Sequence, residues 1–559
     1  MDNRLDASVF GPYQDSHTPV LSWGDLLVRG AVEVPERDVF VFPETRRSYL
    51  SMTERSTEVA RSLRAMGVGP GDHVGILMPN CIEFLEVWFA ISFLGAVCVP
   101  INARFKAREL GYVIENADLV ALLTSDIVEQ HTDYVDLLHE ALPGLNSASD
   151  PLDLHLEAAP RLRGAVMMGS SSRPGFCDRT RFESLASRVD RAEVHELRRR
   201  VAIRDTAVIF YTSGTTSMPK GCLLDHETLF RVGYNTGQRM ELENGCRMFD
   251  PLPLFHTAAT QPMVAVLEAR GTYISMTHFE AGAALELIRS ERVTSMFTAF
   301  PIIAQALLNH ESSSPSDLGD VAVTFNVAPP DALMAMQERM SSTVQVTGFG
   351  MTETGGSVVF TSPSEPVEAR LASEGPPFPG MEIVIKDVES RKRLEVGERG
   401  EICVRGPQVF KGYFKAPEKN AESFDVEGFF LTGDLGMLDD EGRLHYLGRA
   451  KDMLKVGGEN VAAIEIESFL STHPAVSIAQ VVGVPDDRYV EVPAAFIELR
   501  PGHTATENEI IAFCDGEMAR FKVPRYVRFV SEWPMSATKV QKFKLRDALV
   551  AEWTSERAR

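Results

Sequence analysis

The sequence predicts an α/β fold with a large N-terminal domain and a small α+β C-terminal domain. The large domain is expected to contain parallel sheets flanked by helices and, in addition, a β-barrel-like piece. Three observations support this prediction. The chain has 559 residues, more than one hydrophobic core usually supports. Apolar strand-like segments alternate with helical patterns over residues 20–125 and 206–347, which is typical of parallel sheets. After about residue 375 short β-rich pieces separated by turns take over.

The first half shows this alternation most clearly. We predict buried strands at 73–80 (HVGILMPN), 96–102 and 121–125, with a helix over 81–95. The longest apolar run, residues 87–101, is too short to span a bilayer and reads as a buried helix that turns into a strand. Residues 144–180 are rich in glycine, serine and proline, so an exposed irregular excursion is expected there.

The second half predicts a domain boundary. Strands at 381–387 and 400–406 suggest an antiparallel barrel-like piece, and the glycine- and charge-rich stretch 447–460 then breaks the pattern. Beyond it we expect a helix, two strands, a helix over 508–519 and a last strand near 526–530. The predicted division is residues 1–448, a linker at 449–453, and residues 454–559.

Charge and cysteine usage exclude several classes of protein. Lys plus Arg number 56 against 78 Asp plus Glu, a net charge of −22, which disfavours nucleic acid or an anionic membrane as the main partner. Seven scattered cysteines contain no C-x-x-C pair, as in proteins of a reducing cytosol. The start, MDNRLDASVF, carries no signal-peptide pattern. We therefore expect a cytoplasmic protein without an integral membrane segment.

The most informative stretch is TAVIFYTSGTTSMPKG, residues 206–221. An apolar strand runs into glycine and hydroxyl residues and ends in Pro-Lys-Gly. Such a loop suits a polyphosphate, because glycine frees backbone N–H groups, hydroxyls add donors and lysine adds charge. It is not a Walker loop, since Pro219 stands at the second glycine position. The hydroxyl run alone would also fit a surface loop. The candidate phosphate-binding residues are Thr212, Ser213, Gly214, Thr215, Thr216 and Lys220.

This loop resembles the phosphate-binding signature of the adenylate-forming superfamily, which includes acyl-CoA synthetases, peptide-synthetase adenylation domains and luciferases. Ser217 stands where glycine is commonest in the family. The resemblance runs from about residue 25 to 547, and further motifs follow in family order. It implies ATP, Mg2+ and coenzyme A as cofactors or co-substrates.

Further motifs resemble the nucleotide site of the family. In QVTGFGMTETGG, residues 345–356, the resemblance implies that Phe349 packs on adenine and that Thr352 touches the α-phosphate. Gly348 and Gly350, which flank Phe349 in the sequence, would also contact ATP. Glu353, together with Thr212, would hold Mg2+. An aromatic face suits a purine, and a hard divalent ion prefers carboxylate and phosphate oxygens.

Two shorter segments complete the implied nucleotide site. NVAPP, residues 326–330, resembles the adenine-side strand end and brings in Ala328 and Pro329. Thr-Gly-Asp at 432–434 resembles the ribose site, where Asp434 would accept from both hydroxyls beside Arg449. Thr-Gly-Asp alone would normally be a turn; the order and spacing of the set support the functional interpretation.

The resemblance also implies that the C-terminal domain is mobile and swings between two poses about a hinge at Lys451. Gly457 and Gly458 would let the pantetheine chain of CoA run close to the backbone, with Lys455 nearby. Lys522, in the segment RFKVP, would meet the phosphates of CoA. A solvated basic face is the alternative for that segment.

The C-terminal stretch WPMSATKVQKFK, residues 533–544, resembles the family's Pro-x-Thr-x-Thr-Gly-Lys motif with one residue missing. Alignment from the proline places the family lysine on Val540; alignment from the lysine side places it on Lys539 and deletes the glycine. We prefer Lys539, because the next three residues then match. It would bridge the acyl carboxylate and the α-phosphate. A surface charge is the alternative, and the shorter loop leaves slower adenylation open, since one residue shifts a loop tip by up to roughly 3.5 Å.

The acid site is implied by PLPLFHTAATQ, residues 251–261, which resembles the family's Pro-x-Phe-His segment. His256 would gate the acyl tunnel or lie beside the carboxylate, although a core histidine is the alternative. No acidic side chain stands where amino-acid adenylators anchor an ammonium group, which favours a fatty, alicyclic or steroid-type acid. The predicted acyl pocket consists of Phe255, His256, Thr260, Val327, Gly350 and Gly355.

The leading hypothesis is therefore an AMP-forming acyl-CoA ligase, with Lys539, Glu353, Thr352 and His256 as its catalytic residues. The alternatives are an enzyme that delivers the acyl group to a separate carrier protein, a luciferase-like oxidation, and a non-catalytic ATP-binding relative. The expected partners are a small carboxylic acid, ATP and CoA, and a homodimer is left open. Motifs of zinc proteases, serine hydrolases and dinucleotide-binding folds are absent from the sequence.

Overall fold

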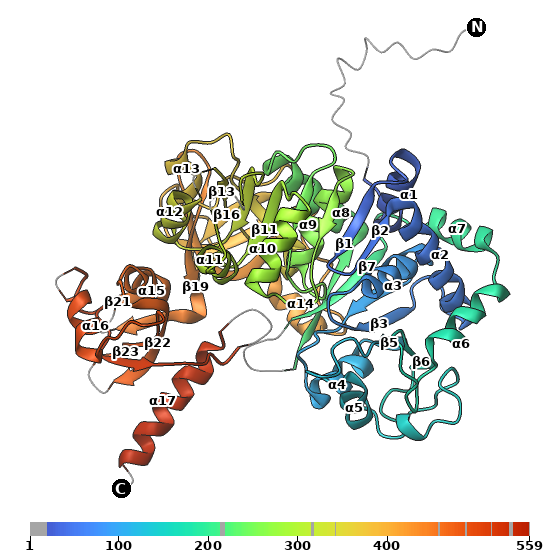
Figure 1. The fold of residues 1–559 in the computed structure, drawn as a ribbon. Coiled ribbons are helices and arrows are strands. Elements are labelled where there is room, and N and C mark those ends of the chain that lie inside the picture. Colours follow the sequence, from blue (N-terminus) through green and yellow to red (C-terminus); the bar gives the residue numbers. More distant parts are fainter. Residues whose placement is uncertain are drawn as a thin grey trace.

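The computed structural model describes residues 20–212, 218–314, 318–340, 342–456, 459–486, 489–515, 517–535 and 540–557. Of Lys451 and Lys455 it describes the backbone alone. Figure 1 shows a large body, coloured blue to orange along the chain, and a smaller group of elements near the C-terminus, drawn in red.

Two mostly parallel sheets form the large body. Each has one antiparallel edge strand, β2 in the first and β8 in the second. The seven-stranded sheet has the order β13 (Val344–Val346), β12 (Val323–Asn326), β11 (Ser295–Ala299), β9 (Arg247–Phe249), β10 (Thr272–Ile274), β1 (Asp38–Phe42) and β2 (Thr45–Ser48). The six-stranded sheet has the order β6 (Gly164–Met167), β5 (Leu119–Thr124), β3 (His73–Leu77), β4 (Val97–Pro100), β7 (Thr206–Thr212) and β8 (Lys220–Asp225).

Helix α3 (Ile82–Phe93) lies in the core between these sheets. Its side chains are almost all buried, as expected for a helix that is apolar all round. The ring of Phe89 packs against Phe40 of β1 with centroids 5.9 Å apart, and Trp88 packs against Phe210 of β7 at 6.2 Å. The apolar run that was too short for a membrane thus joins the two sheets.

Further helices surround the strands of the large body, as Figure 1 shows, and some of them, such as α7, pack on other helices. They are α1 (Trp23–Glu33), α2 (Tyr49–Ala65), α4 (Ala107–Asn116), α5 (Tyr134–Ala141), α6 (Arg179–Ser184), α7 (Arg191–Arg200), α8 (His226–Arg239), α9 (Thr257–Glu268), α10 (Ala281–Ser290), α11 (Pro301–Asn309), α12 (Pro330–Arg339), α13 (Val367–Ala372) and α14 (Pro417–Ser423).

An antiparallel piece follows the two sheets in the chain. A two-stranded ribbon comes first, with the 3-10 turn η4 (Thr352–Thr354) between its strands, and a four-stranded antiparallel sheet comes after it. These strands are β14 (Gly348–Met351), β15 (Gly356–Phe360), β16 (Glu382–Lys386), β17 (Gly400–Arg405), β18 (Phe430–Leu438) and β19 (Leu444–Arg449).

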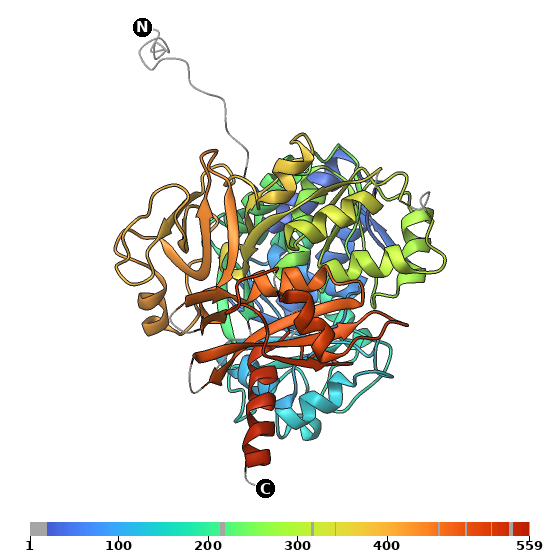
Figure 2. The ribbon, with the colours of Figure 1, turned by 90° about the vertical axis from the view of Figure 1, so that its left-hand side faces the viewer.

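The C-terminal elements have a hydrophobic core of their own, built from residues between Leu454 and Val527. Figure 2 shows their sheet in front of the large body, with α17 projecting away from it. They are η5 (Ala450–Asp452), β20 (Met453–Val456), β21 (Glu459–Ala462), α15 (Ala463–Ser471), β22 (Val476–Asp486), β23 (Val490–Leu499), α16 (Glu507–Cys514), β24 (Tyr526–Phe529) and α17 (Lys542–Arg557).

The predicted fold class is confirmed: parallel sheets with flanking helices, an antiparallel piece and a smaller α+β group. One local expectation was wrong. Residues 144–180 were expected to be an exposed irregular excursion, yet they contain β6, which is buried and pairs with β5. The strand has only four residues, which is too short an apolar run to stand out in a stretch rich in glycine and serine. Among the described residues, no helix combines the length and the apolar character needed to cross a membrane.

Candidate active site

The candidate phosphate loop connects β7 to β8. These strands are antiparallel neighbours, and Thr212 at the end of β7 lies opposite Lys220 at the start of β8. The fold therefore brings the two ends of the loop together. Ser213, Gly214, Thr215 and Thr216 lie outside the described residues.

Glu353 is fixed next to this loop by a residue that the sequence did not point to. The Tyr413 hydroxyl donates to Glu353 Oε1 at 2.7 Å, and the Phe410 N–H donates to the Glu353 carbonyl at 2.8 Å. Burial and the nearby Glu353 charge raise the pKa of Tyr413, so the phenol stays protonated and keeps donating. The Lys220 ammonium lies 5.8 Å from the centre of the Tyr413 ring. Lys220, Tyr413 and Glu353 thus form one group.

The residues present fit the magnesium ion that the resemblance implies. Tyr413 donates to one carboxylate oxygen of the half-buried Glu353, and the other oxygen suits a hard cation. Mg2+ commonly uses one or two carboxylates and completes its shell with substrate phosphates and water. A single carboxylate beside a phosphate loop is therefore a sufficient protein contribution. Among the described residues no cluster of three or more acidic, His or Cys side chains offers a complete metal site.

Asp434 and Arg449 face each other across two antiparallel strands, β18 and β19, in direct register. Arg449 Nε lies 3.2 Å from Asp434 Oδ1; the Asp434 side chain is 3% exposed and that of Arg449 41%. The Asp434 N–H donates to Thr432 Oγ1 at 3.1 Å, and Gly433 has a φ of +72°, which favours glycine. The Thr-Gly-Asp segment is thus a tight turn-like bend that holds a buried carboxylate beside a partly exposed guanidinium.

Phe349 lies in β14, where its ring stacks on that of Tyr446 in β19, with centroids 5.5 Å apart and planes at 28°. The Tyr446 N–H donates to Glu374 Oε2 at 2.7 Å. Burial raises the pKa of Glu374 to about 7. Gly348 is buried in the same strand, whereas Ala328 and Pro329 are half-buried directly after β12. Neither Tyr446 nor Glu374 carried a sequence signal that set it apart.

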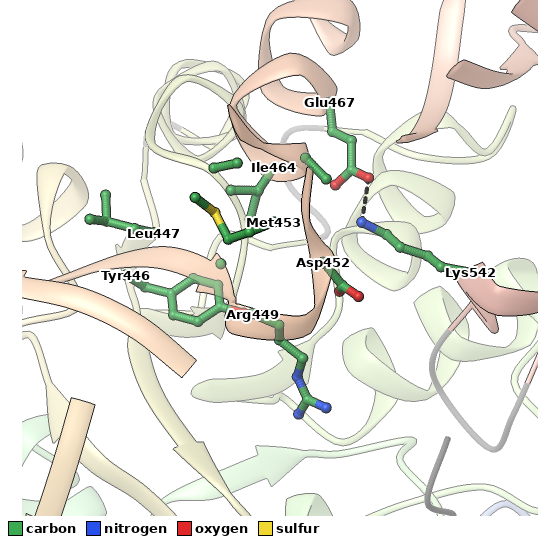
Figure 3. A pocket seen from close by; sticks show the side chains of 11 residues that line it. Tyr446, Leu447, Arg449, Asp452, Met453, Ile464, Glu467 and Lys542 are labelled. Carbon is green, nitrogen blue, oxygen red and sulfur yellow. Dashed lines mark ion pairs between the residues drawn. The ribbon is translucent and has the colours of Figure 1, made fainter. Parts of the chain in front are cut away.

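A small cavity of about 50 Å³ lies where the large body meets the C-terminal elements. Figure 3 shows Arg449 and Tyr446 on one side of it and Glu467 and Lys542 on the other. Its volume is well below the roughly 300 Å³ at which ligand pockets begin. It therefore marks the contact between the two parts of the molecule and is too small to hold a nucleotide. The lining residues are Tyr446, Leu447, Gly448, Arg449, Asp452, Met453, Ala462, Ala463, Ile464, Glu467 and Lys542.

The predicted acyl residues gather partly around the start of α9. His256 is the N-cap of this helix and its Nδ1 accepts from the Ala258 N–H at 3.2 Å, which places any ring proton of the neutral form on Nε2. Phe255 is half-buried and Thr260 is fully buried one turn into the helix. Gly355 is buried with a φ of +69°. Val327, by contrast, is 46% exposed, and Gly350 is exposed as well.

The predicted CoA residues are only partly described. Lys522 Nζ lies 2.5 Å from Glu465 Oε1, and the Lys522 side chain is 23% exposed. Lys455 lies in β20 opposite Asn460 of β21, and Lys451 lies in η5. Gly457 and Gly458 are outside the described residues.

Lys539 lies outside the described residues, but both flanks of its loop are described. Met535 and Val540 form an antiparallel bridge, and the Gln541 N–H donates to the Pro534 carbonyl at 2.7 Å. Lys542 Nζ is 2.6 Å from Glu467 Oε1, which also accepts from the Val481 N–H at 2.6 Å. The short loop is thus closed at its base and tied to α15.

Comparisons with known proteins agree with this geometry. Residues 27–414 match the AMP-binding enzyme model, and residues 465–539 match the AMP-binding enzyme C-terminal domain. A mitochondrial medium-chain acyl-CoA ligase of Rattus norvegicus is 30% identical over 552 residues, covering 96% of this chain and 89% of its own. A methyl-dioxo-octahydro-indenyl-propanoyl:CoA ligase of Rhodococcus jostii is 32% identical over 526 residues, covering 93% of this chain and 97% of its own.

A solved structure is also similar over the whole chain. An anthranilate CoA ligase in complex with anthranoyl-AMP has a TM-score of 0.82 and 26% identity, covering 97% of this chain and 100% of its own. The family match covers more than half of the chain and agrees with the phosphate loop, the Glu353–Tyr413 pair and the Asp434–Arg449 pair. The chain therefore belongs to the AMP-binding enzyme family and is an adenylate-forming enzyme of the acid–thiol ligase class.

Proposed function

We propose that the enzyme activates a hydrophobic carboxylic acid and transfers its acyl group to CoA. In the first step a carboxylate oxygen attacks the α-phosphorus of ATP, and the bond to pyrophosphate breaks. In the second step the CoA sulfur attacks the acyl carbonyl and AMP leaves. The acids that we consider are fatty, alicyclic or steroid-type; the names of the similar ligases from Rattus norvegicus and Rhodococcus jostii support this range.

The observation that carries the proposal is the grouping of Lys220, Tyr413 and Glu353 at the end of β7, on the same molecule as the Asp434–Arg449 pair. Lys220 supplies positive charge for phosphate oxygens. Asp434 suits two vicinal hydroxyls, such as those of a ribose, because a carboxylate accepts several hydrogen bonds. Mg2+, held by Glu353, would neutralise phosphate charge. Thr352, buried beside Glu353, is the proposed α-phosphate donor.

Lys539 is the proposed adenylation lysine. Its ammonium would neutralise the charge that develops between the carboxylate and the α-phosphate as pyrophosphate leaves. The C-terminal domain would then rotate about Lys451, withdraw this lysine and bring Gly457, Gly458 and Lys455 to the site for CoA. In this second pose Lys522 would leave Glu465 and meet a CoA phosphate.

The test is pyrophosphate release from ATP with a panel of aliphatic, aromatic and steroid-like acids, each with and without CoA, while product masses are followed. Acyl-CoA formation with one class of acids would support the proposal and name the substrate class. Acyl-AMP that accumulates with CoA present, and is consumed only when a carrier protein is added, would point to carrier delivery. ATP binding without pyrophosphate release for any acid would contradict both activities.

A further inference from the structure

Three polar side chains from three different elements meet in the interior beside the predicted acyl site. They are Thr236 of α8, Gln261 of α9 and Ser357 of β15, and each is at most 5% exposed. Gln261 Nε2 donates to Thr236 Oγ1 at 2.7 Å and to Ser357 Oγ at 3.0 Å. Gln261 Oε1 accepts from the Ser357 N–H at 2.9 Å. We call these three residues the Gln261 cluster.

The hydrogen bonds hold the Gln261 carboxamide in place. Both of its N–H groups and its oxygen are paired within the protein, so the group has no need of a water or ligand partner. Moving it would leave several buried polar groups unpaired, at a cost of roughly 1–3 kcal/mol for each. The Gln261 cluster is therefore a rigid obstacle that an apolar ligand cannot push aside at low cost.

The cluster adjoins the residues proposed to hold the acid. His256 caps α9, and Gln261 follows five residues later, about 7.5 Å along the helix axis at 1.5 Å per residue. From the opposite side Gly356 touches the carboxamide: a Cβ there would lie 2.2 Å from Gln261 Oε1. Gln261 follows Thr260 and Gly356 follows Gly355, so the carboxamide lies beside two residues of the predicted acyl pocket.

The elements around the cluster pack closely against one another. Helices α8 and α9 are in direct contact, because a Cβ at Gly233 would lie 2.3 Å from Val264 Cβ. On the β15 side a Cβ at Gly355 would lie 2.8 Å from Thr228 Cγ2 of α8. Neither glycine has room for a side chain, so α8 packs closely against α9 and against the segment that begins β15.

We infer that the Gln261 cluster is the end wall of the acyl site and that Gln261 sets the longest acid the enzyme accepts. This inference rests on the proposed function and narrows its substrate class to compact, medium-length acids. Long-chain fatty acids and steroid-sized acids are rejected, because their distal part would have to displace the paired carboxamide.

The test compares wild type with Gln261→Ala, using butanoic, hexanoic, octanoic, decanoic and dodecanoic acids. For wild type, kcat/KM should fall steeply at the longer acids. In Gln261→Ala the space of the carboxamide becomes available. The steep drop in kcat/KM should therefore occur at an acid at least one member longer in the series than for wild type. Since one methylene in an apolar site changes kcat/KM by roughly 10–200-fold, the dodecanoate-to-hexanoate ratio should rise at least about tenfold.

Two further variants separate bulk from hydrogen bonding and from stability. Gln261→Met keeps the length of the side chain but removes the hydrogen bonds that hold it in place, so its cut-off should lie between those of wild type and Gln261→Ala. Gln345→Ala is the matched control: this glutamine is also buried and hydrogen-bonded, to Asn326, but lies in β13. It should lose stability without any change in acid length. The inference would be overturned if a folded, active Gln261→Ala had the same cut-off in acid length as wild type. It would also be overturned if the kcat/KM of wild type for dodecanoate equalled that for hexanoate.

Binding measurements keep this test independent of turnover. Non-hydrolysable acyl-sulfamoyl adenosines of the same chain lengths can be titrated by calorimetry against both proteins. A wild-type affinity that falls beyond a certain length, and is restored by Gln261→Ala, would support the end wall even if no acid is turned over. In that outcome the proposed function alone would fail. Equal affinities for all lengths would reject the end wall even in an active ligase.

Discussion

The large body and the C-terminal elements hold their proposed functional residues in different ways. In the large body Glu353 and Asp434 lie on or beside strands, and each is fixed by a partner from another part of the chain: Tyr413 for the first and Arg449 for the second. The C-terminal elements contribute a short loop, closed at its base by the Met535–Val540 bridge and tied down by Lys542.

This difference matches two different tasks. A site that must bind the AMP moiety in both steps gains from groups that are already in place, because no reorganisation is then needed when charge develops. A lysine that is needed in only one step is better carried on a separate unit that can withdraw. The comparison predicts that changes in the small unit affect one half-reaction, whereas changes in the large body affect both.

The largest expected effect is that of Lys539→Ala. Acyl-AMP formation should fall by at least about 100-fold, because the charge that stabilises the transition state is removed, while thioester formation from supplied acyl-AMP should stay near wild type. Single-turnover assays of the two half-reactions measure this split. Lys544→Ala is the matched control, since Lys544 is exposed at the start of α17, and it should leave both rates unchanged. Equal losses in both half-reactions for Lys539→Ala would remove the distinction between the two units.

The sequence predicted those parts of this arrangement that local patterns encode. The buried helix α3, the strands around it and the phosphate-loop pattern ending at Lys220 stood out from residue type and spacing. The motifs at Glu353 and Asp434 stood out through their resemblance to the adenylate-forming superfamily. Tyr413 did not, because it reaches Glu353 through a pairing between its own segment and β8, nearly two hundred residues earlier in the chain. Long-range contacts of this kind have no signal in a single sequence.

The Gln261 cluster in the interior shows the same limit. Gln261 follows the Phe-His motif closely, yet its role depends on Thr236 and Ser357, which come from two other elements. The sequence suggested small or apolar walls from the residues that match the family motif. It could not show that Gln261 is paired with Thr236 and Ser357, because that pairing depends on the packing of α8 and β15 against α9.

The second-largest expected effect, after that of Lys539→Ala, is that of replacing Lys542, which ties the base of the Lys539 loop to Glu467. Lys542→Ala should lower acyl-AMP formation about tenfold, because misplacement of a catalytic group by about 1 Å costs up to roughly 100-fold. The thioester half-reaction should be spared, and Lys542→Arg should restore most of the loss. Lys419→Ala, which breaks the exposed Lys419–Glu422 pair of α14, is the control and should have no effect. A parallel decline of both half-reactions would make Lys542 a stability residue only.

The smallest expected effect is the pH dependence of stability that Glu374 gives to the large body. Glu374 supports Tyr446 beneath Phe349, and burial raises the pKa of its carboxyl to about 7 from an ordinary 4.5. The folded protein therefore keeps this proton to a higher pH than the unfolded chain does. The contribution to stability is present below about pH 4.5, declines as the pH rises towards 7, and changes no further above that.

Glu374→Gln removes this pH dependence, because the amide does not titrate and still accepts from the Tyr446 N–H. Since Glu374 is partly open to water, we expect the variant to gain only about 1 kcal/mol of unfolding free energy relative to wild type between pH 4.5 and 8. Urea unfolding at several pH values measures the difference. Activity should change less than twofold in both half-reactions alike, since the change lies in the large body. A difference in unfolding free energy that is flat with pH would mean that the Glu374 carboxyl has the same pKa in the folded and unfolded protein. A selective loss of adenylation would contradict the division between the two units.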